Sequence, residues 1–281
     1  MPQTRIACLG GGNMGRALLA ALVRAGHPRD CLTVGEPNST VRANLQRDLG
    51  IAAYADNAAA VAGAEVVILA VKPQDAAATL TPLRAPLAPL QPLLLSIVAG
   101  LRCADLEHWS GPLPIVRAMP NRPALVGAGA SGLYAPPAVS TRHRELATYV
   151  MQSAGTVVWL ESEAQLNAVT AVSGSGPAYF FLLAEALVGA AIAQGLSEPV
   201  ARRLAIATLY GAGVMAAQSD GDLTALRAAV TSKGGTTAAA LEILDGATGL
   251  RPLVAAAVDA AVRRGTELAR AFGAPDGAGR G

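Results

Sequence analysis

Charged residues are scarce in this chain of 281 residues, and their two signs nearly cancel. They make up 15% of the sequence with a net charge of +2 at pH 7, and the basic residues form no runs. The chain therefore lacks the positive field that would attract nucleic acid or an anionic membrane surface. Apolar residues reach 52%, which excludes a disordered chain and provides for extensive burial. We expect a folded protein that acts on a small molecule, without a nucleic-acid partner.

Cysteine is also rare. The three cysteines, Cys8, Cys31 and Cys103, have neither an even count nor the spacing of metal ligands. We expect reduced, mostly buried thiols, no metal site and a cytoplasmic location. The first expected strand starts by Arg5, and no cationic segment with an apolar stretch and cleavage site precedes it. We therefore expect no secretory leader.

Long hydrophobic runs are few, and the longest is Pro177–Leu196. Its length approaches that of a membrane span. The run contains Glu185 and Gln194 and begins from a Ser-Gly cluster. A buried or dimer-facing helix is therefore the preferred interpretation, and we expect no membrane partner.

A glycine-rich turn near the N-terminus carries the first functional signal. The segment RIACLGGGNMGRALLAALVRAG passes from an apolar strand, Ile6–Leu9, through glycines into a helix of 3.6-residue period. Gly10, Gly12 and Gly15 match G-x-G-x-x-G in the strand–turn–helix context of dinucleotide binding. The first glycine permits the tight turn, the second lets the backbone approach a pyrophosphate, and the third lets the helix pack against the strand. Glycine turns also serve purely structural connections, but this context favours a dinucleotide.

An acidic residue ends the second expected strand, CLTVGEPN. Glu36 stands 21 residues after Gly15, about where an acid binds the ribose 2′-hydroxyl of NAD. A 2′-phosphate would be repelled there unless a base such as Arg42 turned inward. A solvated glutamate beside the Pro37 turn is an equally good interpretation.

Two continuous apolar runs, Val66–Val71 and Leu93–Val98, are typical of parallel strands covered on both faces. Ligands of such sheets bind at the carboxyl ends of the strands, here Ala70–Pro73 and Val98–Gly100. Lys72 lies at this edge, where its ammonium group could reach a phosphate or ribose. A plain surface lysine is the alternative.

Further segments predict two more strands of the sheet, and the segments after them predict helices. LPIVRAMPN and GTVVWLES are strand-like, TRHRELATYVMQSAG is helical, and Gly, Pro and Ala predict a loop from Pro120 to Pro137. Strand signals vanish from Glu163 onward. The helical patterns that follow are Glu163–Val172, Pro177–Gly195, Pro199–Gln218, Asp222–Val230, Thr236–Asp245 and Leu250–Phe272.

These patterns predict an α/β fold with two domains. Residues 1–162 form a Rossmann-type domain with a mainly parallel sheet, and residues 163–281 form an all-α domain. The helices have more apolar face than a small bundle can hide, so we expect a homo-oligomer with a dimer formed through this half.

The segment VTSKGGTTAAALEIL opens one of these helices with small and hydroxyl residues. The turn 231–235 and the first amides of the helix can converge on one anion of carboxylate size. Its glycines allow close backbone approach, and its hydroxyls can donate to the anion or touch an adjacent nitrogen. Lys233 is expected to point to solvent, and a contribution of positive potential near the anion is the other interpretation. A capped helix with a glycine loop is the alternative.

Five segments together resemble the pyrroline-5-carboxylate reductases: AVTSKGGTTAAALEIL, AVTAVSGSGPAYFFLLAEAL, GGGNMG, LAVKPQ and VRAMPNRPALVGAG. They occur in the family's order and cover nearly the whole chain. The resemblance implies reduction of the cyclic imine 1-pyrroline-5-carboxylate to L-proline, the last step of proline biosynthesis, with NADPH or NADH. It also implies a Rossmann domain followed by a helical domain that interlocks as a dimer, often within larger rings.

The resemblance also assigns residues to the two ligands. The cofactor contacts that it implies are Leu9, Gly10, Gly11, Gly12, Asn13, Met14, Asn57, Ala70, Val71, Lys72, Pro73, Val98 and Ala99, and the strand-end argument adds Gly35 and Glu36. The implied contacts of the substrate carboxylate are Ser232, Gly234, Gly235 and Thr236, with the Thr237 hydroxyl as the catalytic group near the ring nitrogen.

The chain departs from the family pattern at two places, Ala229 and Gly35-Glu36, and Lys233 stands at a position that the motif lets vary. Many members have Asn where this chain has Ala229, so a hydrogen bond made there is absent. Many have proline at the position of Lys233. NADPH-preferring members have small hydroxyl residues in place of Gly35-Glu36, which puts NADPH preference in doubt.

Two rival functions remain open. Two-domain dehydrogenases of hydroxy acids share this layout but use a lysine on a helix of the second domain, which has no lysine apart from Lys233. A dinucleotide sensor without turnover is the other rival, and the intact Ser-x-Gly-Gly-Thr-Thr turn argues against it. His27, His108 and His143 lie outside the inferred site, and we expect them to be structural or solvated.

Overall fold

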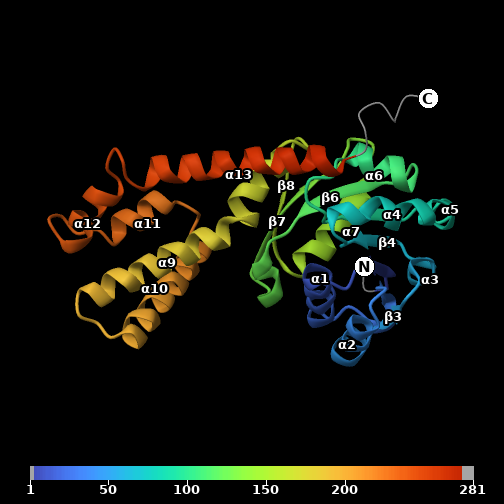
Figure 1. The fold of residues 1–281 in the computed structure, drawn as a ribbon, viewed down its shortest axis with the longest axis horizontal. Helices are drawn as coiled ribbons and strands as arrows, with labels where there is room; N and C mark the ends of the chain where they lie inside the picture. Colours follow the sequence, from blue (N-terminus) through green and yellow to red (C-terminus); the bar gives the residue numbers. More distant parts are fainter. Residues whose placement is uncertain (1–2, 274–281) are drawn as a thin grey trace. The chain divides into compact units, whose positions relative to one another are not determined.

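The computed structural model describes residues 3–273 and contains one eight-stranded sheet (Figure 1). The strand order is β3-β2-β1-β4-β5-β6-β7-β8, and all neighbours are parallel except β6 and β7. The strands are β1 Ile6–Leu9, β2 Leu32–Gly35, β3 Ala52–Tyr54, β4 Val66–Leu69, β5 Leu93–Ser96, β6 Ile115–Met119, β7 Gly129–Tyr134 and β8 Gly155–Trp159. The order reverses at β1, as in a Rossmann-type sheet, so the predicted fold class is confirmed.

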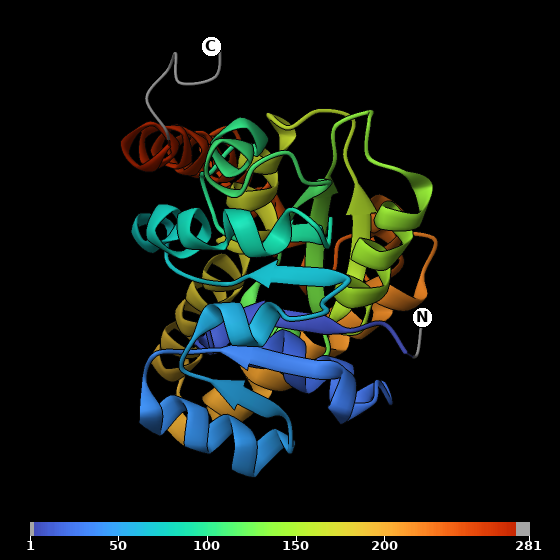
Figure 2. The same cartoon turned by 90° about the vertical axis from the view of Figure 1, so that its right-hand side faces the viewer.

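Helices cover both faces of this sheet (Figure 2). One face packs against α1 Asn13–Arg24, α2 Ser39–Leu49 and α7 Thr141–Gln152. The other packs against α3 Asn57–Val61, α4 Ala76–Leu80, α5 Arg84–Leu87 and α6 Cys103–Ser110. Every residue of β1, β4 and β5 is buried. This explains their continuous apolar runs, because a strand covered on both faces has no side for polar residues.

The prediction of a loop from Pro120 to Pro137 was wrong. This segment contains a short 3-10 helix, Arg122–Val126, and then β7, which pairs antiparallel with β6 and parallel with β8. The glycines of β7 mark close packing: a Cβ on Gly129 would lie 2.7 Å from the carbonyl oxygen of Ala154. A Cβ on Gly132 would lie 2.7 Å from a methyl group of Val169. Glycine indicates close approach here as well as turns.

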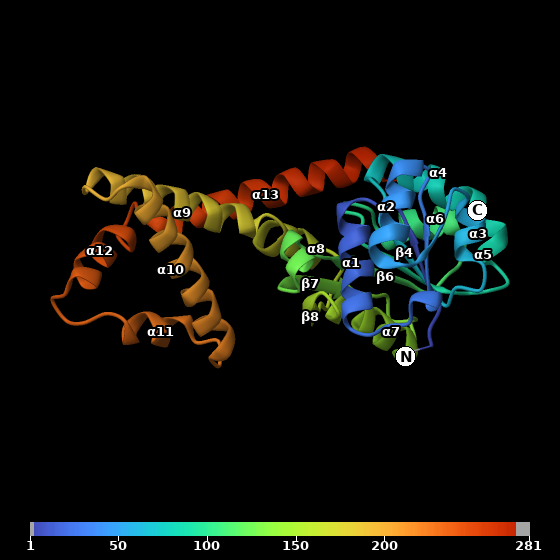
Figure 3. The same cartoon turned by 90° about the horizontal axis from the view of Figure 1, so that it is seen from below.

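The rest of the chain is helical, as predicted. α9 and α10 form a helical hairpin, and α11 and α12 follow it (Figure 1 and Figure 3). The helices are α8 Gln165–Val169, a π-helical turn Thr170–Gly174, α9 Gly176–Ala193, α10 Glu198–Gln218, α11 Leu223–Ala229, α12 Thr236–Leu244 and α13 Leu250–Phe272.

The chain divides into two compact units, which differ from the predicted domains 1–162 and 163–281. The first comprises residues 1–174 and 261–281, and the second comprises residues 175–260. The first helical turns after residue 162 belong to the sheet unit because their side chains bond into it. Glu163 accepts a hydrogen bond from the backbone N–H of Cys103 and pairs with Arg117, and Leu166 is buried.

The second unit exposes large apolar side chains on α9 and α10. Phe181 is 62% exposed, Leu182 is 67% exposed and Tyr210 is 75% exposed. The helical stretch Gln165–Ala193 is long and apolar enough to cross a membrane by length and composition, and its most apolar window is only 6% buried. The single chain therefore leaves this apolar surface uncovered, which is typical of an interaction surface.

Candidate functional site

The glycine turn between β1 and α1 is shaped by two close backbone approaches. Gly10 has a φ of +103°, and a Cβ there would lie 2.7 Å from the carbonyl oxygen of Ala70. A Cβ on Gly15 would lie 2.2 Å from the carbonyl oxygen of Gly10 and 3.1 Å from the sulfur of Cys8. α1 thus begins directly against the end of β1, and the first and third glycines of the motif are sterically required.

The second glycine of the motif faces open space. Gly12 is exposed, and a Cβ built on it has no heavy atom within 4 Å. It is the N-cap of α1, and no side chain accepts a hydrogen bond from the first turn of the helix. The helix therefore presents free N–H groups at its positive end, beside a gap that a side chain at position 12 would fill. This arrangement fits a pyrophosphate.

Backbone hydrogen bonds hold the carboxyl ends of β2, β1 and β4 side by side. The N–H of Gly10 donates to Gly35 at 2.9 Å, and the N–H of Ala70 donates to Leu9 at 2.8 Å. The next strand is joined in the same way, since Ile97 donates to Leu69 at 3.1 Å. Four segments predicted to contact the cofactor therefore lie along one edge of the sheet.

The predicted cofactor residues differ in what they offer at this edge. The side chains of Leu9 and Val98 are buried in the core, so these residues present backbone only. Asn57 begins α3, and its side-chain oxygen lies 2.3 Å from where a Cβ on Gly35 would be, which explains that glycine. Gly12, Asn13, Lys72 and Ala99 are exposed, and Met14, Val71 and Pro73 are half-buried.

Glu36 is held against the glycine turn by two backbone amides. Its Oε2 accepts a hydrogen bond from the N–H of Gly11 at 2.8 Å, and its Oε1 accepts one from the N–H of Asn38 at 2.9 Å. The guanidinium of Arg42 donates to the carbonyl oxygens of Glu36 and Pro37 at 2.7 and 2.8 Å. Glu36 is therefore held in place and half-buried rather than freely solvated. The Arg42 side chain is hydrogen-bonded to backbone carbonyl oxygens.

Two cysteines of the sheet unit, Cys8 and Cys103, are buried, and Cys31 is partly buried. Burial raises the pKa of the Cys8 thiol to about 12, and the nearby carboxylate of Glu36 adds to the effect. Burial also raises the pKa of Cys103, assisted by the carboxylate of Glu163. All three cysteines are free thiols. Neither buried thiol has the thiolate character that a nucleophile needs.

The turn before α12 gathers the predicted substrate residues in one short stretch. Gly234 has a φ of +70°, a conformation that favours glycine. A Cβ on Gly235 would lie 2.3 Å from the hydroxyl oxygen of Ser232, and the N–H of Gly235 donates to the carbonyl oxygen of Ser232 at 3.1 Å. Ser232, Lys233, Gly234 and Thr236 are exposed, and Thr237 is half-buried. The side chain of Lys233 is exposed in the single chain.

The start of α12 is also free of a side-chain cap. Its N-cap is Gly235, and no side chain accepts a hydrogen bond from the first N–H groups of the helix. Free amides, an exposed serine hydroxyl and a glycine with open space around it therefore share one turn. Such a turn suits an anion of carboxylate size.

A buried asparagine that was not singled out from the sequence ties the π-helical turn to β7. The side-chain oxygen of Asn121 accepts a hydrogen bond from the N–H of Ala130 at 2.9 Å, and its Nδ2 donates to the carbonyl oxygen of Ser173 at 3.0 Å. Asn121 is 8% exposed. It anchors the π-helical turn to β7, and the only sequence signal for it was its place in the MPN segment after β6.

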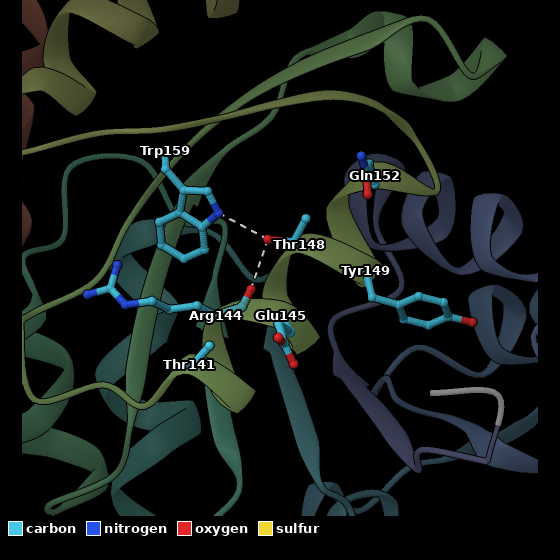
Figure 4. A pocket seen from close by; sticks show the side chains of 7 residues that line it. All are labelled: Thr141, Arg144, Glu145, Thr148, Tyr149, Gln152 and Trp159. Carbon is cyan, nitrogen blue, oxygen red and sulfur yellow. Dashed lines mark hydrogen bonds between the residues drawn. The ribbon is translucent and has the colours of Figure 1, made fainter.

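A separate hollow lies on the outer face of α7, away from the predicted site residues (Figure 4). It has a volume of about 310 Å³. Trp159 donates a hydrogen bond from its indole N–H to the Thr148 hydroxyl at 3.0 Å, and the Arg144 guanidinium lies 5.1 Å from the indole ring centre. These contacts fix the end of β8 against α7, so the hollow has a structural explanation.

Comparison with known proteins supplies the family. A family model described as pyrroline-5-carboxylate reductase dimerisation matches residues 163–268, and one described as NADP oxidoreductase coenzyme F420-dependent matches residues 5–100. The pyrroline-5-carboxylate reductase of Pseudomonas aeruginosa is 45% identical over 274 residues, covering 97% of this chain and 100% of the relative. That of Vibrio alginolyticus is 41% identical with the same coverage.

Solved structures agree with these matches. A pyrroline-5-carboxylate reductase from Coxiella burnetii has a TM-score of 0.91 at 37% identity, covering 95% of this chain and 98% of that one. The pyrroline carboxylate reductase of Plasmodium falciparum, solved with NADP bound, has a TM-score of 0.80 at 27% identity, covering 96% and 99%. The similarity therefore spans both units.

Proposed function

The chain belongs to the pyrroline-5-carboxylate reductase family, and from this premise we propose which of its residues hold each ligand. It reduces 1-pyrroline-5-carboxylate to L-proline, the last step of proline biosynthesis, with NADPH or NADH. The residue assignment is based mainly on two helices, α1 after Gly12 and α12 after Gly235, whose first N–H groups have no side-chain cap. Each offers free N–H groups to one of the two anionic ligands.

The amides of Gly12, Asn13 and Met14 at the start of α1 would hold the cofactor pyrophosphate, because those of Gly10 and Gly11 already donate to Gly35 and Glu36. Gly12 supports this placement because its missing side chain leaves open space beside those amides. The strand ends Ala70–Pro73 and Val98-Ala99 line the path along the sheet edge toward the nicotinamide. When bound, the reduced nicotinamide supplies the hydride that adds to C5 of the imine.

The substrate carboxylate would lie on the turn before α12, where the Ser232 hydroxyl and the amides of Gly234 and Thr236 donate hydrogen bonds. The N–H of Gly235 is held by the carbonyl oxygen of Ser232, so Gly235 contributes close backbone approach rather than a donor. The Thr237 hydroxyl lies near the ring nitrogen and supports its protonated form. An iminium carbon is already electrophilic, so holding the two ligands in register supplies much of the rate. This explains why the proposed site contains no histidine.

We infer that NADH is preferred over NADPH. The carboxylate of Glu36 is fixed at the end of β2 by two amides, at the position where an acid accepts hydrogen bonds from an unmodified ribose. A 2′-phosphate placed there meets this negative charge. Arg42, the base nearest in the sequence that could offset this charge, donates from Nη1 to the carbonyl oxygens of Glu36 and Pro37.

The chain forms homo-oligomers, and we propose that the dimer is made through the C-terminal helices. The dimerisation model matches residues 163–268, which include the exposed apolar side chains of α9 and α10. A second copy of this chain is thus the partner that covers these side chains, in the cytoplasm, and no membrane is required. Association of two apolar faces removes their surface from water.

The test is a spectrophotometric assay of the purified protein with DL-1-pyrroline-5-carboxylate and either NADH or NADPH, following loss of absorbance by the reduced cofactor. We expect turnover with both and a higher kcat/KM with NADH. A higher kcat/KM with NADPH would overturn the role given to Glu36. Cofactor binding without turnover would indicate a non-catalytic sensor.

A further inference from the structure

A polar cavity in the sheet unit lies beside the β5–α6 loop and takes no part in the proposed ligand sites. Its volume is about 700 Å³, and its walls come from this loop, from β6, from the start of α8 and from the last turns of α13. All of these segments belong to the same compact unit. Three arginines line it: Arg102, Arg117 and Arg270.

Arg117 is buried in the wall of this cavity and retains unused donors. Its side chain is 9% exposed, and Nη1 donates to Oε1 of Glu163 at 2.9 Å. That oxygen also accepts the N–H of Cys103 at 2.6 Å. No fully buried side-chain nitrogen or oxygen among the described residues lacks a partner. The other guanidinium nitrogens of Arg117 have no acceptor among residues 3–273 and must therefore reach the cavity.

The remaining charges of the cavity do not balance. The buried carboxylate of Asp105 pairs with Arg102 at 3.0 Å, and Glu163 pairs with Arg117. Arg270 on α13 has no acidic partner among residues 3–273. Asn167 adds a side-chain amide to the wall. Hydrogen-bond donors and positive charge thus exceed the acceptors that the described residues provide.

We propose that this cavity binds a phosphate dianion, either free or carried by a small organic molecule. Guanidinium groups bind phosphate oxygens with paired, charge-assisted hydrogen bonds. A phosphate that accepts hydrogen bonds from Arg270 and from the remaining guanidinium nitrogens of Arg117 supplies the acceptors that the described residues of the cavity lack. The volume also leaves room for a substituent on the phosphate.

The position of the cavity connects it to the cofactor edge of the sheet. Gly100, with a φ of +85°, lines the cavity and follows Val98 and Ala99 directly. A Cβ on Gly100 would lie 3.2 Å from the Cα of Ala269, so α13 packs against this loop. An anion that joins Arg270 to the β5–α6 loop therefore stabilises the loop whose first residues are assigned to the nicotinamide.

The test is titration calorimetry of the full chain with sodium phosphate at constant ionic strength. NADH and L-proline are kept saturating so that the glycine turn and the α12 turn are filled. We expect saturable binding of one phosphate per chain. Arg270→Gln should weaken it about tenfold, because charge-assisted hydrogen bonds to the anion are lost. Arg263→Gln, an exposed arginine on the same helix outside the cavity, is the matched control and should leave the affinity unchanged.

Each outcome decides the question. Absence of saturable heat, or equal affinity in the wild-type and Arg270→Gln proteins, would overturn the proposal. An equal loss of affinity in Arg263→Gln would show a general charge effect and also overturn it. A parallel titration with glycerol 3-phosphate distinguishes the two sources, since tighter binding than inorganic phosphate assigns the site to a phosphate ester.

Discussion

The carboxylate of Glu36 accepts a hydrogen bond from the backbone N–H of Gly11 at 2.8 Å. The bond joins the end of β2 to the glycine turn that follows β1. It fixes one negative charge beside the place proposed for the cofactor ribose. The position of this carboxylate is therefore determined by the fold before any cofactor arrives.

Replacing Glu36 by Gln should change cofactor preference and leave the fold intact. The amide oxygen can still accept from Gly11, but the negative charge that opposes a 2′-phosphate is gone. We expect the ratio of kcat/KM for NADPH to that for NADH to rise about tenfold, the size of one charged hydrogen bond. Steady-state kinetics measure the ratio, and an unchanged ratio with an unchanged Tm would remove Glu36 from cofactor selection.

Alanine at the second and third glycines of the motif should affect different properties, NADH binding at Gly12 and stability at Gly15. Gly15→Ala places a Cβ 2.2 Å from the carbonyl oxygen of Gly10, so we expect a loss of about 1–3 kcal/mol in the free energy of unfolding. Gly12→Ala meets no atom within 4 Å and should keep the wild-type Tm while weakening NADH binding. Thermal unfolding and NADH fluorescence titration separate the two effects. Normal NADH affinity in Gly12→Ala would contradict the placement of the pyrophosphate.

Thr237→Ala should reduce turnover more than cofactor affinity. Loss of the hydroxyl removes one hydrogen bond near the reacting nitrogen, and we expect kcat to fall about tenfold or more. Lys233→Ala changes an exposed side chain of the same turn and serves as the control, with little change in kcat. Assays with NADH at saturating substrate give both values. Equal kcat in wild type and Thr237→Ala would exclude Thr237 from the mechanism.

His27 should make stability depend on pH. Its Nε2–H donates to the carbonyl oxygen of Thr4 at 3.0 Å, so its Nδ1 accepts from the hydroxyl of Tyr149 at 2.9 Å. Burial lowers the pKa of His27 below its usual value. The unfolded chain thus binds the proton more tightly, and stability that is complete above about pH 6.5 falls as the pH drops through the folded pKa.

Denaturant unfolding of the wild type and of His27→Gln measures this dependence. Glutamine can donate and accept but does not titrate. We expect the free energy of unfolding of the wild type to fall more than that of the variant as the pH is lowered from 7.5 to 5. A difference that stays constant over this range would show that His27 does not titrate on unfolding.

Charge on α9 should weaken the dimer. Leu182 is 67% exposed in the single chain, and we expect Leu182→Glu to shift the protein toward monomer because the glutamate must be buried in the interface. Val126→Glu, at a side chain that is 81% exposed in the sheet unit, is the matched control. Light scattering after size-exclusion chromatography measures the mass. A Leu182→Glu protein with the wild-type mass would place the interface elsewhere.

The sequence was sufficient for features set by local pattern. Continuous apolar runs located β4 and β5, and glycine spacing located the turn before α1, because burial and tight turns restrict residue type at each position. The strand from Gly129 to Tyr134 was missed, since its glycines are selected by close contact with Ala154 and Val169, which lie far along the chain.

Contacts between residues that are far apart in the chain were likewise not predicted from the sequence. Arg117 and Glu163 are ordinary polar residues in the sequence, and their ion pair in a cavity wall exists only because β6 and α8 meet. The bond between Glu36 and Gly11 is similar: position suggested an acid near the ribose, but not the amide that fixes it.

The path of α13 limits how this protein can be shortened or recombined. The chain leaves the sheet unit after Gly174 and returns at Ala261, and Phe272 at the end of α13 packs against the apolar cluster beneath α4 and α6. The helical unit is therefore an internal insertion in the sheet unit rather than a tail. Truncation before α13 would remove part of the core of the nucleotide-binding unit, and exchange of helical units between relatives requires two junctions.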